Sequence, residues 1–136
     1  MTVAHHELCF GCGLANLFGL QLELSPEADG ALAGRFFVKQ DHQGPPGFAH
    51  GGVLGTALDE AMALVVHHAG IYALTRRLEV DLLGPAPVGS FAHVRAWVAS
   101  DEGRTLRLES ELRGDAADGP VLARGAGVFV RVPAGG

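Results

Sequence analysis

Apolar and polar residues alternate along several stretches of the chain, with the period of half-buried β-strands. Residues 20–24 and 31–38 predict two strands, which a turn at residues 26–30 joins into a hairpin. The second half of the chain predicts four more strands, separated by turns rich in Gly, Pro and Asp. These strands cover residues 72–83, 91–99, 105–113 and 121–132, and we expect them to form an antiparallel meander.

A stretch of different composition separates the two sets of strands. Residues 53–68 are rich in Ala, Leu and Met, which favour helix, and Gly70 ends the stretch. Apolar residues fall on nearly every side of this helix, so we expect it to be buried almost all round. This order of elements predicts an α+β fold in which a curved antiparallel sheet encloses a central helix. The length fits a single domain, residues 1–136.

The composition narrows the classes of function. A net charge of -5 offers no polybasic surface for a phosphate backbone, so nucleic-acid binding is not expected. The first residues do not have the pattern of a signal peptide, and no apolar run approaches the roughly 20 residues that span a bilayer. We therefore expect a cytoplasmic protein that does not associate with membranes.

The predicted helix carries two adjacent carboxylates, Asp59 and Glu60. A carboxylate in apolar surroundings is costly unless it is paired, and neighbours on a helix point about 100° apart. One of them can face the concave side of the sheet while the other reaches an edge or a partner subunit; alternatively, both make structural salt bridges. Asp59 has small residues one turn away, among them Gly55 and Ala63, which leaves room for a ligand.

Two glycines, Gly51 and Gly52, follow His50 at the start of this helix. Glycines let a ligand oxygen approach backbone N–H groups at the positive end of the helix dipole. Such amides can form an oxyanion hole. With a carboxylate about two turns further along, the segment has the parts needed to hydrolyse an activated acyl group.

Three segments resemble the PaaI-type hotdog-fold acyl-CoA thioesterases, and the likeness covers nearly the whole chain. They are Cys9-Phe-Gly-Cys-Gly13, Gly44-Pro-Pro-Gly-Phe-Ala-His-Gly-Gly52 and Leu58-Asp-Glu-Ala61. The resemblance implies hydrolysis of acyl-CoA to a free acid and CoA, without cofactor. It also implies a homodimer with the active site between protomers, or a homotetramer built as a dimer of hotdog dimers.

The resemblance also implies roles for individual residues. The family places its catalytic carboxylate nine positions after the His, which is Asp59, as general base or nucleophile. A glycine amide polarises the carbonyl, and by position we expect Gly52 in preference to Gly51. Thr75 matches a residue that places the water, although an ordinary strand threonine is the alternative. His50 is expected to support the loop, with a role as general acid or as carbonyl-polarising donor as the alternative.

Further residues are expected to contact the substrate. Gly51 and Gln43 lie at or before the helix start, although Gly44 stands where some relatives carry Asn. Phe48 and Met62 predict an apolar lining for the acyl part, whose size stays open.

Other functions carry weaker signals. His5, His6, Cys9 and Cys12 contain a Cys-x-x-Cys half-site for zinc, but no second pair follows at suitable spacing, so no metal is expected. The Cys-containing loop is expected to be structural, near the acyl or partner interface. The competing function is a non-catalytic module that binds or senses acyl-CoA in the same cavity. A hydratase variant needs His at position 64, which is Leu.

Overall fold

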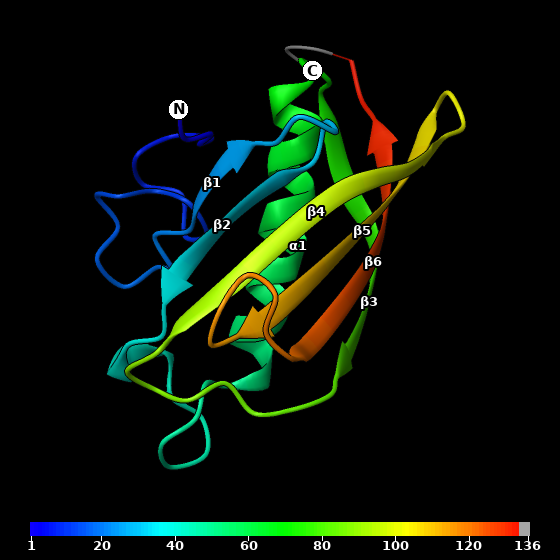
Figure 1. The fold of residues 1–136 in the computed structure, drawn as a ribbon. Coiled ribbons are helices and arrows are strands. Elements are labelled where there is room, and N and C mark those ends of the chain that lie inside the picture. The colour runs from blue at the N-terminus through cyan, green and yellow to red at the C-terminus, as the bar shows by residue number, and fades with distance from the viewer. Residues whose placement is uncertain (134–136) are drawn as a thin grey trace.

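One long helix lies against a curved six-stranded antiparallel sheet (Figure 1). The structure is a computed structural model that describes residues 1–133. Helix α1 spans Gly51–His68, and a short 3-10 helix, Gln40–His42, precedes it. The strands are β1 (Glu23–Pro26), β2 (Leu32–Phe37), β3 (Ala73–Leu82), β4 (Phe91–Asp101), β5 (Thr105–Gly114) and β6 (Val121–Arg131). The predicted α+β fold is confirmed. No helix in residues 1–133 combines the length and the apolar character needed to cross a membrane.

The strand order in the sheet is β1-β2-β4-β5-β6-β3. The predicted hairpin of β1 and β2 is confirmed, as is the meander from β4 to β6. The prediction was wrong for β3, which pairs with β6 at the edge of the sheet instead of with β4. After α1 the chain enters β3 at this edge of the sheet. Residues 83–90 then connect β3 to β4, which pairs with β2 (Figure 1).

The first strand begins three residues later than predicted. Gln21 has a positive φ of 54°, which interrupts an extended strand. The amides of Leu20 and Leu22 donate to the carbonyls of Phe10 and Gly11 in the N-terminal segment, not to β2. Both leucines are still buried, so the alternation correctly predicted which side chains enter the core even where it misplaced the strand.

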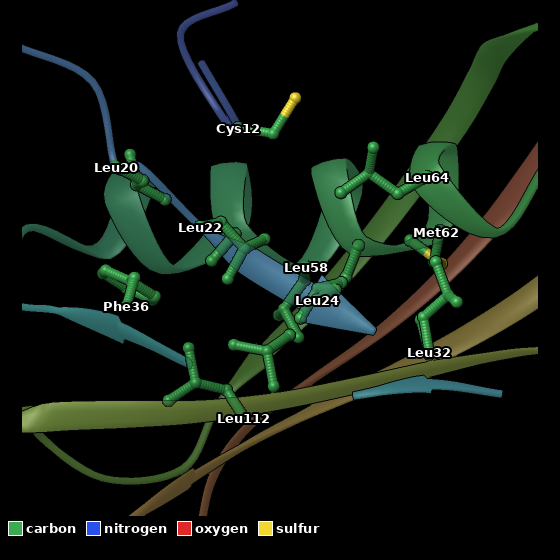
Figure 2. Close-up of a cluster of buried hydrophobic side chains, with 14 of the residues drawn as sticks. Cys12, Leu20, Leu22, Leu24, Leu32, Phe36, Leu58, Met62, Leu64 and Leu112 are labelled. Atoms are coloured by element: carbon green, nitrogen blue, oxygen red, sulfur yellow. The ribbon is translucent and has the colours of Figure 1, made fainter. Parts of the chain in front are cut away.

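The core lies between α1 and the sheet. Leu24, Leu58 and Leu112 have no exposed surface, and Figure 2 shows their side chains converging between helix and strands. The close approach depends on β6: a Cβ on Gly125 would stand 3.1 Å from Cβ of Leu58. Glycine at this position therefore sets the distance between helix and sheet.

Helix α1 was predicted to be buried almost all round, but it is less enclosed than that. The sheet covers one side, and the N-terminal segment covers another. A third side, beside β3, stays partly open because no element of residues 1–133 lies over it. This open stripe consists of Gly52, Thr56, Asp59 and Ala63.

Truncating Leu58 should destabilise the fold strongly. Leu58→Ala leaves a cavity under the helix and should lower the free energy of unfolding by about 3 kcal/mol. Leu17 is 71% exposed, so Leu17→Ala should change the free energy of unfolding by less than about 0.5 kcal/mol. Urea unfolding at one fixed protein concentration measures both. Equal midpoints for the two variants would contradict the packing described for α1.

Candidate active site

The start of α1 is held by His50, its N-cap residue. The His50 Nδ1 atom accepts a hydrogen bond of 2.9 Å from the amide of Gly52. The preceding loop is compact: a Cβ on Gly44 would stand only 2.7 Å from Cα of His50, and Oε1 of Gln43 accepts from the amide of Gly47 at 2.8 Å. His50 and Gln43 thus both stabilise the loop and the helix start.

The first helical amide, that of Gly51, has no acceptor among residues 1–133. It lies at the positive end of the helix dipole, where a carbonyl oxygen or an anion is stabilised. Gly51 is partly exposed, and a Cβ there would meet only the end of the Leu82 side chain, at 2.9 Å. Of the two glycines, Gly51 therefore offers the open donor, because the amide of Gly52 is already bonded to His50.

Asp59 lies in the open stripe and faces β3. Its Oδ1 atom accepts a hydrogen bond of 2.8 Å from Oγ1 of Thr75. A β-bulge makes this contact: the register with β6 shifts between Thr75 and Arg77. Simple alternation would turn Thr75 away from Val80, which packs towards the helix at Gly55. The extra residue reverses the facing, so Thr75 also points towards α1.

The surroundings of Asp59 favour the neutral form of its carboxyl group more than water does. Burial raises the pKa of this carboxyl above its ordinary value, and the charge of Glu60 raises it further. The hydrogen bond from Thr75 and the positive charge of His5 act in the opposite direction. Thr75 is thus the neighbour that most favours the ionised form, which is the form that acts as a base or nucleophile.

Glu60 points away from Asp59, towards the N-terminal segment. Its Oε2 atom lies 3.0 Å from Nδ1 of His5 and 3.3 Å from Sγ of Cys9. Burial raises the pKa of Glu60, but hydrogen bonds, led by the one with His5, bring it below the ordinary value. Hydrogen bonds with Cys12 and Glu60 raise the pKa of His5 to about 11. The two adjacent carboxylates therefore have separate surroundings.

The structure brings only some of the predicted residues together. Phe48 is 38% exposed and bridges to Pro87 near the helix start. Met62 is fully buried beneath β6, against Gly127, and does not reach the open stripe, so its place in the substrate lining stays a prediction. Helical periodicity alone cannot distinguish a core methionine from a pocket methionine.

A comparison with protein-family models gives one match, to the model described as the thioesterase superfamily. The match covers residues 46–116, just over half of the chain, and includes α1 with both glycines, Asp59 and Thr75. The chain belongs to the thioesterase superfamily.

Curated relatives in this superfamily carry the name acyl-coenzyme A thioesterase. THEM4 of Xenopus laevis is 31% identical over 71 residues, which are 52% of this chain and 32% of that protein. THEM5 of Mus musculus is 32% identical over 90 residues, 66% of this chain and 36% of that protein. The chain thus spans about a third of the length of these relatives.

Solved structures of the superfamily share the fold. A crystal structure of a thioesterase superfamily protein is 27% identical with a TM-score of 0.83, covering 90% of this chain and 62% of the other. The PaaI protein of the E. coli phenylacetic acid degradation operon is 20% identical with a TM-score of 0.76. The match covers 84% of this chain and 81% of the PaaI chain. A hypothetical thioesterase from Streptococcus pneumoniae TIGR4 with coenzyme A is 18% identical, with a TM-score of 0.75. The match covers 82% of this chain and 85% of the other. The predicted hotdog fold and the resemblance to PaaI-type thioesterases are confirmed.

The raised pKa of Asp59 predicts a pH-dependent stability difference. The folded protein holds the proton to higher pH than the unfolded chain, whose carboxyl titrates near 3.8, so ionised Asp59 destabilises the fold above the folded-state pKa. Asp59→Asn should therefore raise the melting temperature at pH 7. The gain should shrink as the pH falls through the folded-state pKa and vanish below about pH 4.

Thermal unfolding from pH 4 to 8 tests this, with Asp118→Asn as the matched control. Asp118 is exposed in the turn between β5 and β6, so its substitution should leave the melting temperature unchanged across the range. A lower melting temperature for Asp59→Asn at pH 7 would contradict the burial cost assigned to this carboxylate.

Proposed function

We propose that the protein is a thioester hydrolase that cleaves acyl-CoA to a free acid and CoA, with Asp59 as general base or nucleophile. Its main support is the half-buried Asp59 carboxylate, which has one oxygen bonded to Thr75 and lies in the open stripe of α1. The names of the curated relatives support an acyl-CoA substrate. The Thr75 hydroxyl favours the ionised carboxylate and leaves its second oxygen for water or for the thioester carbonyl.

We assign the carbonyl-polarising donor to the amide of Gly51 rather than Gly52. The Gly52 amide donates to His50, whereas that of Gly51 has no acceptor in residues 1–133. His50 acts in this arrangement as the cap that fixes the helix start. A thioester oxygen at Gly51 gains the positive end of the helix dipole as its charge develops in the transition state.

One protomer cannot bring Gly51 and Asp59 to the same carbonyl for direct attack. They lie eight positions apart along the helix, which gives a rise of about 12 Å and a turn of about 80° around the axis. A donor and a nucleophile that flank one carbonyl stand only about 7 Å apart, from ordinary hydrogen-bond and attack distances. We therefore propose that each active site combines Gly51 of one protomer with Asp59 of its partner.

A two-fold dimer supplies this combination if the two α1 helices run antiparallel and cross at Gly55. Residue 55 lies midway between 51 and 59, so each helix start then meets the partner's Asp59, as an isologous interface requires. Gly55 suits a close crossing, since it has no side chain to keep a second backbone at a distance.

Strand β3 provides a second contact for the dimer. Its outer edge has no neighbouring strand in the described chain, and it exposes Leu74 and Leu82 by 61% and 55%. A long edge strand with exposed apolar side chains is a site where another strand can pair, although β3 also carries four charged residues. Pairing of β3 with its copy would join the sheets edge to edge and cover the stripe of α1, and two such dimers can form a tetramer.

Asp59→Asn should abolish most hydrolysis. Loss of the base or nucleophile should lower kcat by about 100- to 10,000-fold while the fold is retained. Thiol release is measured over a panel of short-chain, medium-chain and aryl-acetyl CoA thioesters, with the thiols of Cys9 and Cys12 subtracted in a substrate-free blank. Asp118→Asn is the matched control and should retain wild-type turnover.

Two outcomes would count against this function. Equal turnover by wild type and Asp59→Asn would remove Asp59 from the mechanism. No thiol release with any thioester, together with retained CoA binding, would favour the acyl-CoA binding or sensing module.

Complementation tests the composite site. Gly51→Pro removes the proposed donor, yet proline suits the first helical position, and His50 already has φ -62° and ψ 138°, which a following proline accepts. Gly51→Ala is the matched control, because it adds a Cβ but keeps the amide. Gly51→Pro and Asp59→Asn should each be inactive, and unfolding and refolding them together should restore about a quarter of wild-type activity.

The expected fraction follows from the geometry. Half of the random dimers are mixed, and each mixed dimer holds one intact site and one doubly defective site. Activity that stays at the level of the separate variants, although mixed dimers form, would show that Gly51 and Asp59 do not meet across an interface.

A further inference from the structure

Four side chains that the proposed hydrolysis does not use converge beside the middle of α1. His5, Cys9 and Cys12 come from the N-terminal segment, and Glu60 comes from the helix. One nitrogen, two sulfur and one oxygen atom all lie within 4.8 Å of one another. These are the atom types that bind zinc in proteins.

The spacing of these atoms fits a tetrahedral ion. With ordinary zinc bond lengths, two ligand atoms of a tetrahedral site stand about 3.4 Å apart for an N–O pair. The distance is about 3.6 Å when one of the two atoms is sulfur and the other is N or O. The distance from His5 Nδ1 to Glu60 Oε2 is 3.0 Å, and that from Cys9 Sγ to the same oxygen is 3.3 Å. The sulfurs of Cys9 and Cys12 lie 3.8 and 3.7 Å from His5 Nδ1. Small shifts would place all four around one ion.

The backbone holds the N-terminal segment in this arrangement. A Cβ on Gly11 would stand 2.4 Å from Cγ of Glu60, so only glycine lets the loop lie against this side chain. A Cβ on Gly13 would stand 2.4 Å from the carbonyl oxygen of Glu7, which shows how tightly the loop folds back. The amide of His5 donates to Sγ of Cys12 at 3.2 Å, a contact that favours a thiolate.

The burial and the donor types indicate a structural site. Cys12 is 2% exposed, and the side chain of Glu60 is 12% exposed, so an ion here would have little room for water. Four protein ligands close the coordination shell, as in structural zinc sites, whereas Mg²⁺ and Ca²⁺ prefer shells of oxygen. A divalent cation would also offset two of the three negative charges of the carboxylate and two thiolates that the cluster brings together.

We propose that His5, Cys9, Cys12 and Glu60 bind one zinc ion that fastens the N-terminal segment to helix α1. The ion takes no part in hydrolysis. It fixes the helix at Glu60, the residue next to Asp59, from the side opposite the sheet. Figure 2 shows Cys12 on that side of the helix, with Leu112 of the sheet on the other.

The test uses the full chain without a histidine tag, reduced, loaded with Zn²⁺ and then freed of excess metal. Elemental analysis should give about one zinc per chain. Loading with Co²⁺ instead should give the visible bands of a tetrahedral ion and near-ultraviolet thiolate-to-metal absorption. Removal of zinc with a chelator should lower the melting temperature by roughly 5 °C or more.

Matched variants separate this site from adventitious binding. Glu60→Gln and the double variant Cys9→Ser/Cys12→Ser should each weaken zinc binding by at least about 100-fold. Asp59→Asn and His6→Ala alter the neighbouring carboxylate and histidine and should keep one zinc per chain. Circular dichroism checks that each variant is folded.

Two results would overturn the proposal. One is the absence of stoichiometric zinc in folded, reduced wild-type protein after loading. The other is zinc that folded Glu60→Gln and the double cysteine variant bind as tightly as wild type. Neither depends on thioester hydrolysis, so failure of the proposed enzymatic function would leave the zinc site standing.

Discussion

The packing of helix α1 onto the sheet is the constraint on which the rest of the structure depends. Leu58 and Met62 have no exposed surface, and each meets a glycine of β6 that admits the helix at close range. With these two side chains fixed, the rotation of the helix about its axis is fixed as well. Every other side chain of α1 then has a set direction, into the core, towards the N-terminal segment, towards β3 or into the open stripe.

This rotation explains how two adjacent carboxylates acquire different surroundings. Asp59 points towards β3, where a neutral hydroxyl donates one hydrogen bond, and burial keeps its pKa above the ordinary value. Glu60 points to the N-terminal segment, where several donors lower its pKa. A carboxylate with a single hydrogen-bond donor keeps one oxygen available to a ligand or a proton, whereas a carboxylate held by several partners is fixed in place. The difference follows from about 100° of helix rotation.

Local patterns predicted the elements well, because alternation and helix composition act over a few residues. They could not predict three features that depend on distant parts of the chain. Thr75 faces α1 only because a bulge reverses the alternation of β3. Strand β3 lies at the edge because it pairs with β6, the last strand in the sequence, and not with β4, the next one. Glu60 meets Cys9 across 51 residues of sequence, and no spacing rule could add this helical carboxylate to the cysteine pair.

The open stripe of α1 follows from the same packing. A helix between a sheet and a covering segment has a third side, and here that side carries Gly52, Thr56, Asp59 and Ala63, small residues with one carboxylate. Small residues bury little surface in a monomer, so they add little to its stability. They do permit the close approach of another backbone, and beside them lies the outer edge of β3, which pairs with no strand in residues 1–133 and exposes Leu74 and Leu82. A partner copy would be favoured by both features together, since pairing the strands would cover the stripe without changing the fold of either protomer.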